Sequence, residues 1–235
     1  MGTNIDGMTK DWDHSYERRE NFVFWPSDNA IRFVSRYLRK RVGLDAVQDV
    51  LPGAKGSKVL DFGCGIGRHI QFGHSMGLEM YGIELSSVAV GEAHKWAHEM
   101  LKGAEKDRIR VGDVRELPWK DGFFDHALSD SVVDSMSIEI ARKGVSELAR
   151  VLKPGGLFYC NLIAEKDPVT GELFSGEKEV TTAHEQGTIQ SYFDKRKIDD
   201  LFSAKFETLQ SELHTVVNVL TGGSAGRWHL VLRRK

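Results

Sequence analysis

The stretch VLDFGCGIGRHI, residues 59–70, places three glycines on alternate positions directly after a short apolar run. Glycine tolerates positive φ angles and lets the main chain approach another group without an intervening side chain. In a parallel α/β sheet, a turn between a strand and the following helix lies at the carboxyl edge, where such folds bind ligands. The stretch therefore predicts an α/β fold that binds a ligand at Gly63, Gly65 and Gly67.

From residue 58 onward, strand-like and helix-like patterns alternate along the chain. Apolar strands are expected at residues 58–62, 78–85, 108–114, 123–129 and 157–163. Helices are expected at residues 65–77, 86–103 and 137–156, with Ser86 as a cap and Pro154 and Gly155 ending the last helix. This alternation requires crossover connections and predicts a doubly wound, largely parallel sheet. A short Gly-rich link joins residues 207–220 to residues 227–235, which favours an antiparallel hairpin.

Two regions of the chain depart from this alternation. Residues 1–57 are expected to form an N-terminal helical cap segment, with a helix over residues 27–43 that Ser27 or Asp28 caps. Residues 58–235 form the predicted binding domain. Within that domain, the polar stretch 164–190 is longer than most connections in a compact fold, so it predicts a lid or an insertion.

The composition argues against several classes of protein. The chain has a net charge of -2, so it lacks the basic field that attracts nucleic acid or anionic membranes. No apolar run approaches the roughly 18 residues of a membrane span, and the polar N-terminus lacks the core of a signal peptide. Cys64 and Cys160 are the only cysteines, which suggests a reducing compartment. We expect a cytoplasmic protein without a membrane partner, for which nucleic acid is a disfavoured partner.

The spacing of the glycines distinguishes two classes of ligand. A dinucleotide site requires G-x-G-x-x-G, in which the last glycine lets the helix pack closely against the strand. Here the spacing is G-x-G-x-G, and Arg68 stands at the position of that last glycine. This mismatch disfavours a nicotinamide-dependent oxidoreductase.

Five motifs in chain order resemble those of the class I S-adenosylmethionine-dependent methyltransferases, specifically the small-molecule type. The motifs are DFGCGIG at 61–67, YGIEL at 81–85, GDVRELPW at 112–119, FFDHALSDS at 123–131 and LARVLKPGGLF at 148–158. The resemblance extends from about residue 58 to the C-terminus. It implies a Rossmann-like α/β fold with a seven-stranded, mostly parallel sheet and an antiparallel last strand. It also implies S-adenosyl-L-methionine as cofactor and S-adenosyl-L-homocysteine as product.

The same resemblance implies roles for individual residues. Glu84 would hold the ribose hydroxyls, because one carboxylate can accept hydrogen bonds from both. Asp113 would meet the adenine amine, and Asp61 would orient the ammonium group directly or through water. The expected cofactor-binding residues are Asp61, Gly63, Cys64, Gly65, Gly67, Glu84, Leu85, Asp113, Val114 and Ser129.

The methyl acceptor is less constrained by the sequence. Methyl transfer is an in-line displacement that requires close positioning, and a hydroxyl acceptor also benefits from a base. The expected candidates for catalysis are His184, Asp130 and Asp134. The expected substrate or cap residues are Trp12, Tyr16, Trp25 and Tyr192. Arg68 and His69 are expected to support the start of the helix after the glycine loop.

The sequence thus predicts methyl transfer to an oxygen or nitrogen atom of a small metabolite, such as a natural product or a saccharide. Methyltransferases that act on nucleic-base amines resemble one another in an Asn/Asp-Pro-Pro-aromatic run after the fourth strand, where this chain has SDSVV. No metal site is expected, because HKWAH lacks the glutamate of H-E-x-x-H. The alternatives are a protein or RNA methyltransferase and a non-catalytic module that binds the cofactor.

Overall fold

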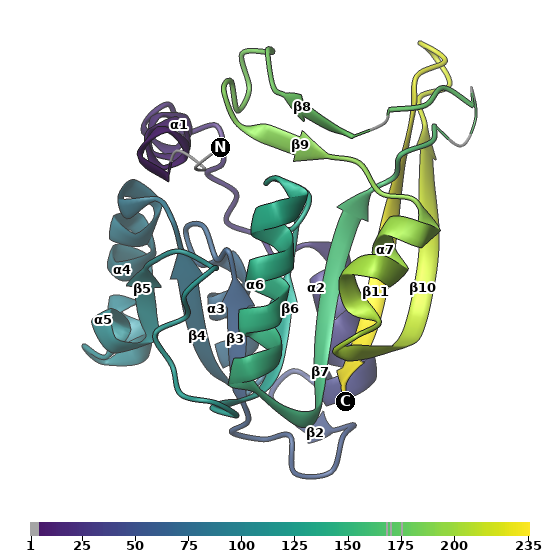
Figure 1. Cartoon of the computed structure of the whole chain (residues 1–235). Coiled ribbons are helices and arrows are strands. Elements are labelled where there is room, and N and C mark those ends of the chain that lie inside the picture. Colours follow the sequence, from purple (N-terminus) through teal and green to yellow (C-terminus); the bar gives the residue numbers. More distant parts are fainter. Residues whose placement is uncertain (1–4, 168, 170, 175) are drawn as a thin grey trace.

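The computed structural model describes residues 5–235 other than residues 168, 170 and 175 (Figure 1). A seven-stranded sheet in the order β10-β11-β7-β6-β3-β4-β5 forms its centre. Its strands are β3 (Lys58–Phe62), β4 (Glu79–Glu84), β5 (Ile109–Val111), β6 (Phe124–Ser129), β7 (Leu152–Ile163), β10 (Phe206–Val217) and β11 (Ser224–Arg234). The strands from β7 to β5 are parallel, and β11 is antiparallel to both of its neighbours. The predicted fold class is confirmed.

Helices cover both faces of this sheet. They are α3 (Arg68–Ser75), α4 (Ser87–Leu101), α5 (Glu105–Arg108), α6 (Ile138–Val151) and α7 (Lys195–Phe202). Successive residues of a strand point to opposite faces. Val59 of β3 belongs to the apolar cluster that includes residues of α3 and α4, whereas Leu60 belongs to the cluster that includes residues of α6 and α7. Burial on both faces explains why the central strands are continuous apolar runs.

The ends of two helices test the expected boundaries. The Ser86 hydroxyl accepts a hydrogen bond from the Ala89 amide at 3.2 Å, so the predicted cap of α4 is confirmed. Helix α6 ends at Val151, earlier than expected, and Leu152 already pairs with Phe124 of β6. A proline disfavours the helical conformation at the residue before it. Pro154 therefore excludes Lys153 from the helix, and β7 begins in the segment that we expected to be helical.

The N-terminal 57 residues contain a small hairpin as well as helices. Their elements are α1 (Ile5–Glu17), α2 (Asp28–Phe33), the π-helical turn η1 (Val34–Leu38), β1 (Arg39–Arg41) and β2 (Val47–Asp49). Ser27 caps α2 as predicted, but the helix expected over residues 27–43 ends at Leu38. That prediction was wrong for its last turn. Arg39 is extended and buried, because its guanidinium donates to the Asp49 carboxylate at 2.7 Å and to the Met76 carbonyl.

Two segments lie beyond the carboxyl edge of the main sheet (Figure 1). One is α1, and the other is the antiparallel pair β8 (Glu177–Glu179) and β9 (Ile189–Ser191). The pair belongs to the stretch 164–190 that we predicted as a lid or insertion, of which residues 168, 170 and 175 lie outside the described residues. Within the described ranges, no helix is both long and apolar enough to cross a bilayer.

Candidate functional site

A cavity opens at the carboxyl ends of β3, β4, β5 and β6, below α1 and the turn between β8 and β9. Its empty space, open to solvent, is about 1100 Å³. Its lining comes from the glycine loop, the residues just past β4, β5 and β6, α1 and the β8–β9 turn.

The glycine loop forms one wall of the cavity. Gly63 and Gly65 line it, with φ angles of +80° and +52° that disfavour other residues. A Cβ atom at Gly63 would lie 2.5 Å from the methyl groups of Val132, and one at Gly65 would lie 2.7 Å from the Tyr16 hydroxyl. Cys64 also lines the cavity, whereas Gly67 lies at the N-cap of α3 and packs against Ala93. The loop thus exposes bare main chain to the cavity.

Glu84, the last residue of β4, brings a carboxylate to the same wall. Its two oxygens accept hydrogen bonds from the Gly65 amide at 3.1 Å and from the Ser86 amide at 3.0 Å. The residue is 8% exposed, and burial raises the pKa of its carboxyl group against the effect of these amides. Leu85 follows it along the cavity wall. A partly satisfied, buried carboxylate therefore faces the cavity beside the glycine loop.

Asp113 and Val114 line the cavity beyond the end of β5. The Arg115 guanidinium donates to both carboxylate oxygens of Asp113, with its Nε atom 3.0 Å from each. Burial would raise the pKa of Asp113, but the hydrogen bonds from Arg115 lower it. This residue is therefore a charged carboxylate whose partner is its own neighbour in the chain.

Asp61 and Ser129 lie behind the cavity wall and do not line it. Both carboxylate oxygens of Asp61 are buried without a hydrogen-bond partner among the described residues, and so is the Ser129 hydroxyl. Nδ1 of His69 lies 3.6 Å from one Asp61 oxygen. Burial raises the pKa of Asp61, although His69 opposes this effect. Asp61 therefore keeps free acceptor capacity directly beneath the glycine loop.

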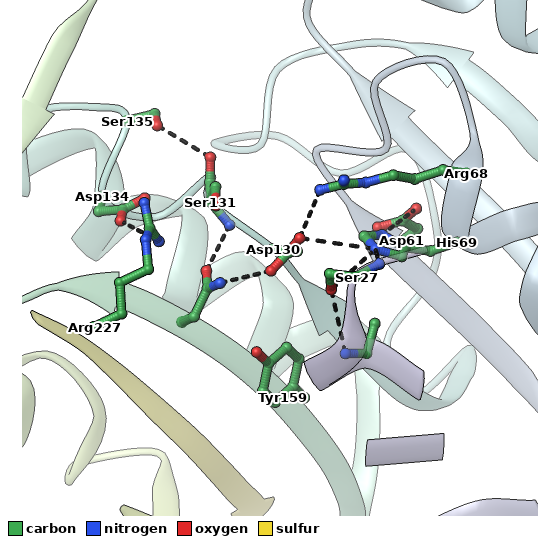
Figure 2. Close-up of polar contacts among 12 residues, drawn as sticks. Ser27, Asp61, Arg68, His69, Asp130, Ser131, Asp134, Ser135, Tyr159 and Arg227 are labelled. Carbon is green, nitrogen blue, oxygen red and sulfur yellow. Dashed lines mark hydrogen bonds and ion pairs between the residues drawn. The ribbon is translucent and has the colours of Figure 1, made fainter. Parts of the chain in front are cut away.

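A polar network surrounds Asp130, just past the end of β6 (Figure 2). Arg68 donates to one Asp130 oxygen at 2.6 Å, and the Asn161 amide group donates to the other at 2.6 Å. Asn161 also accepts from the Ser131 amide at 2.6 Å, and His69 Nε2 lies 3.8 Å from Asp130. Arg68 and His69 belong to the first turn of α3 as expected, yet both also line the cavity.

The other predicted catalytic and cap residues occupy different places. Asp134 is fully buried in an ion pair with Arg227 at 3.0 Å and does not line the cavity. The side chain of His184 is 60% exposed, and its neighbour Glu185 lines the cavity instead. Trp25 is 83% exposed, and the ring of Tyr192 stacks on another aromatic ring outside the cavity.

Helix α1 contributes Trp12 and Tyr16 to the cavity wall, as the sequence predicted for cap residues. Asp13 anchors the helix, because the Ser86 hydroxyl donates to its carboxylate at 2.6 Å and the Val88 amide at 3.3 Å. These donors belong to the N-terminus of α4, where a negative charge is favourable. Burial, followed by the charge of Glu84, raises the pKa of Tyr16. The side chain of Tyr16 extends from α1 to the glycine loop, where its hydroxyl lies against Gly65.

Several lining residues were not among the expected site residues, although Ile66, Arg115 and Ser131 lie within the motifs. They are Met8, Asn21, Val23, Ile66, Arg115, Ser131, Val132, Ser135, Met136, Ile140 and Glu185. Ser131 and Glu185 have positive φ angles of +60° and +57°, which nothing in their local sequence indicates. The apolar members come from α1, the chain after it, the glycine loop, the segment between β6 and α6, and the first turn of α6. Apolar residues at these places also fit a plain core.

Residues 60–160 match the protein family described as a methyltransferase domain. The matched segment begins in β3 and ends in β7. It contains the glycine loop, Glu84, Asp113 and Asp130, and it leaves out α1 and the β8–β9 pair.

Relatives and solved structures agree with this match. A sterol 24-C-methyltransferase of Gibberella zeae is 33% identical over 137 residues, which cover 56% of this chain and 32% of that protein. A tRNA N(3)-cytidine methyltransferase of Danio rerio is 26% identical over 189 residues, which cover 72% of this chain and 51% of that protein. The chain thus spans between a third and a half of the length of these relatives.

One similar solved structure is the 1,6-didemethyltoxoflavin-N1-methyltransferase of Burkholderia thailandensis with bound 1,6-didemethyltoxoflavin and S-adenosylhomocysteine. It has a TM-score of 0.64 and 18% sequence identity, and the match covers 98% of this chain and 88% of that one. A likeness at this identity concerns the fold. It extends over the N-terminal segment and the β8–β9 pair as well as the sheet.

Proposed function

The chain carries a class I S-adenosylmethionine-dependent methyltransferase domain, and on this premise we propose that it methylates an oxygen or nitrogen atom of a small molecule. The main support is the cavity at the carboxyl edge of the sheet, where the bare glycine loop faces the carboxylate of Glu84. When bound, S-adenosylmethionine supplies an electrophilic methyl group on a sulfonium cation.

The residues at this wall fit the cofactor. Gly63 and Gly65 bring main chain to this wall, and the Val132 methyl groups and the Tyr16 hydroxyl lie next to them, so the ligand would meet main chain flanked by these two side chains. Glu84 would accept hydrogen bonds from the two ribose hydroxyls, a charge-assisted contact. Asp61 lies behind the wall, and its oxygens have no hydrogen-bond partner in the described part of the chain, so it would accept from the ammonium group through water.

The remaining predicted cofactor residues would hold the two ends of the molecule. Asp113 and Val114 would contact the adenine ring, with Leu85 and Cys64 beside the ribose. The main chain near Ser129 would approach the methionine end. These assignments follow the resemblance of the motifs, and the position of the four side chains along one wall supports them.

Asp130 is our choice among the three catalytic candidates, because it alone of them lines the cavity. Arg68 and Asn161 hold its two oxygens, so its carboxylate is fixed in position. A hydroxyl or amine acceptor that donates to Asp130 would be oriented by it. The proton that the acceptor loses would pass to this carboxylate or to water.

The shape of the cavity supports a small acceptor. Both α1 and the β8–β9 turn lie over it, and its walls include the apolar side chains of Met8, Val23 and Met136. A polyanion such as RNA would meet more carboxylates than arginines among the lining residues. Because one relative is a tRNA methyltransferase, methylation of RNA is the second candidate function. The third is a module that binds the cofactor without catalysis.

We further propose that residues 164–190 and α1 form a lid, and that the protein works in the cytoplasm. The Arg18 guanidinium donates to the Ala183 carbonyl at 3.1 Å, which joins the two segments above the cavity. Cys64 and Cys160 are both free, which suits a reducing compartment. Protease cleavage between residues 164 and 190 should slow when S-adenosylhomocysteine is present. Equal cleavage with and without it would contradict the lid.

Thermal unfolding tests the proposed cofactor. S-adenosylhomocysteine at about 100 times its dissociation constant should stabilise the protein by about 2.7 kcal/mol. NADH should give no shift, because Arg68 replaces the last glycine of a dinucleotide motif. A shift with NADH alone would reject the methyltransferase assignment.

Catalysis needs a separate measurement. Incubation with S-adenosylmethionine and a library of small alcohols and amines should release S-adenosylhomocysteine with at least one of them. Bulk tRNA in the same assay serves as the comparison. Release with tRNA alone would replace the small-molecule proposal by the RNA one, and binding without release in any mixture would favour the non-catalytic module.

A further inference from the structure

The turn between β8 and β9 brings to the cavity a carboxylate that is not among the expected cofactor-binding residues. Glu185 lies in this turn and lines the cavity, although neighbouring residues of the turn are exposed to solvent. Its own side chain is 19% exposed. A glutamate on a surface turn ordinarily extends into water. The inward direction of this side chain therefore needs a structural cause.

The cause is a strained main chain held by several hydrogen bonds. The φ angle of Glu185 is +57°, a left-handed conformation that costs energy in residues other than glycine. Its amide donates to the Glu20 carboxylate at 2.9 Å, and its carbonyl accepts from the Thr188 amide at 3.1 Å and hydroxyl at 2.8 Å. Strain of this kind tends to occur at functional sites, where the surrounding structure maintains it.

Among the residues that the structure describes, Glu185 is also the cavity carboxylate that has no hydrogen-bond donor on its side chain. Glu84 accepts from two amides, Asp113 from Arg115, and Asp130 from Arg68 and Asn161. Within the described residues, the basic side chain within ion-pair distance of Glu185 is His184, at 3.6 Å. The side chain of His184 is 60% exposed, so water screens this pair.

The charge of Glu185 also reaches the boundary between the two halves of the cavity. Burial is the main cause of the raised pKa of Tyr16, and the charges of Glu84 and Glu185 add to it. The Tyr16 hydroxyl itself lies over the glycine loop. Tyr16 is therefore within electrostatic reach of both Glu84 and Glu185.

We propose that Glu185 determines the specificity of the acceptor site, by binding a positively charged ammonium or guanidinium group of the methyl acceptor. The inference rests on the proposed function and adds the chemical class of the acceptor. The apolar walls formed by Met8, Val23 and Met136 suit an acceptor with an aryl or alkyl body. An anionic acceptor, such as a carboxylate or a phosphate ester, is repelled by the same residue.

Three matched ligands test this inference on the full chain saturated with S-adenosylhomocysteine. They are 2-phenylethylamine, the neutral 2-phenylethanol and the anionic 3-phenylpropanoate, and isothermal titration gives each dissociation constant. The amine should bind the wild type about tenfold more tightly than the alcohol, as expected for one charge-assisted hydrogen bond. The acid should bind more weakly than the alcohol.

Two variants separate the effect of the Glu185 charge on binding from the effect of its strained main chain on stability. Glu185→Gln should abolish the preference for the amine and leave the affinity for the alcohol and for S-adenosylhomocysteine unchanged. Glu185→Gly should lose the same preference and be at least as stable as the wild type, because glycine takes the +57° angle without strain. Glu179→Gln, an exposed glutamate of β8, is the matched control and should keep the preference.

The failures of the two proposals are distinguishable. If S-adenosylhomocysteine does not bind the wild type, the proposed function fails. If it binds but the wild type does not prefer the amine, or binds none of the three ligands, the inference about Glu185 is overturned and the cofactor assignment stands. A preference that persists in Glu185→Gln would also overturn it.

Discussion

The two halves of the cavity are built in different ways. The half to which we assign the cofactor consists of the ends of adjacent parallel strands, with the glycine loop after β3 and Glu84 at the end of β4. The half to which we assign the acceptor consists of α1, the residues that follow it and the β8–β9 turn, which are joined by single hydrogen bonds such as that from the Glu185 amide to Glu20. One half is part of the sheet, and the other is attached to it.

This difference separates what is common to a family from what varies within it. The match to the methyltransferase domain spans residues 60–160, which hold the cofactor half and Asp130 but neither cover segment. A rigid sheet edge suits a ligand that every member binds. Loops and terminal helices tolerate change, so they are suited to carry substrate specificity.

The largest effect is expected in the cofactor half. Glu84→Ala should weaken S-adenosylhomocysteine binding about 100-fold, or about 3 kcal/mol, because it removes a charged acceptor for two hydroxyls. Isothermal titration measures the change, with Glu92→Ala on the outer face of α4 as the control. Unaltered binding in Glu84→Ala would contradict the ribose contact that we assign to Glu84.

A smaller loss should follow where the two halves meet. In Gly65→Ala the new Cβ atom would lie 2.7 Å from the Tyr16 hydroxyl and 3.6 Å from the ring carbon that bears it. We expect about tenfold weaker binding of S-adenosylhomocysteine, from this clash and from the positive φ angle. The double variant with Tyr16→Phe should recover part of the affinity. No recovery would mean that α1 does not press on the loop.

The sequence could predict the cofactor half because its determinants are local. Glu84 follows Gly63 by 21 positions, the span of one strand–helix–strand unit, so the motif alone places it beside the loop. Glu185 could not be found in this way. Its direction depends on Glu20, 165 positions away, and on a φ angle that no local motif encodes. Asn161 was missed for a similar reason, since it reads as an ordinary strand residue but holds the turn at Asp130 and Ser131.

The error in the N-terminal region has the same origin. Residues 27–43 show a helical apolar period, yet the helix stops at Leu38. The Arg39 side chain is drawn into a buried contact with Asp49 and the Met76 carbonyl, and its main chain becomes extended. The apolar periodicity of a segment indicates its local preference for a helix. Here the contacts of Arg39 with residues distant in the sequence override that preference.

The free energy needed to detach α1 should be smaller than the free energy needed to unfold the sheet. Asp13→Ala removes an acceptor at the N-terminus of α4, a change that costs about 1 kcal/mol in similar caps. Hydrogen exchange should accelerate in residues 5–17 and stay unchanged in β3. Lys10→Ala, at an exposed position of α1, is the control. Equal acceleration in β3 would show that α1 and the sheet unfold together, which would contradict a separately attached α1.

The smallest effect concerns pH, which should act on the two halves in opposite directions. Burial raises the pKa of Glu84 and Asp61 above their ordinary values of 4.5 and 3.8. Above these values the unfolded chain has lost the protons while the folded protein still holds them. The free protein is therefore destabilised by these groups as the pH rises toward the raised folded values.

A bound ligand should reverse that trend, because its ammonium group and hydroxyls stabilise the charged carboxylates. The rise in melting temperature caused by S-adenosylhomocysteine should grow as the pH increases from about 4.5. The hydrogen bond from the Glu185 amide lowers the pKa of Glu20, so the contact between the covers holds above 4.5 and is lost as acid protonates Glu20. Glu84→Gln should flatten the ligand effect, and Glu20→Gln should leave it unchanged. A ligand shift independent of pH in the wild type would show that neither buried carboxylate meets the cofactor.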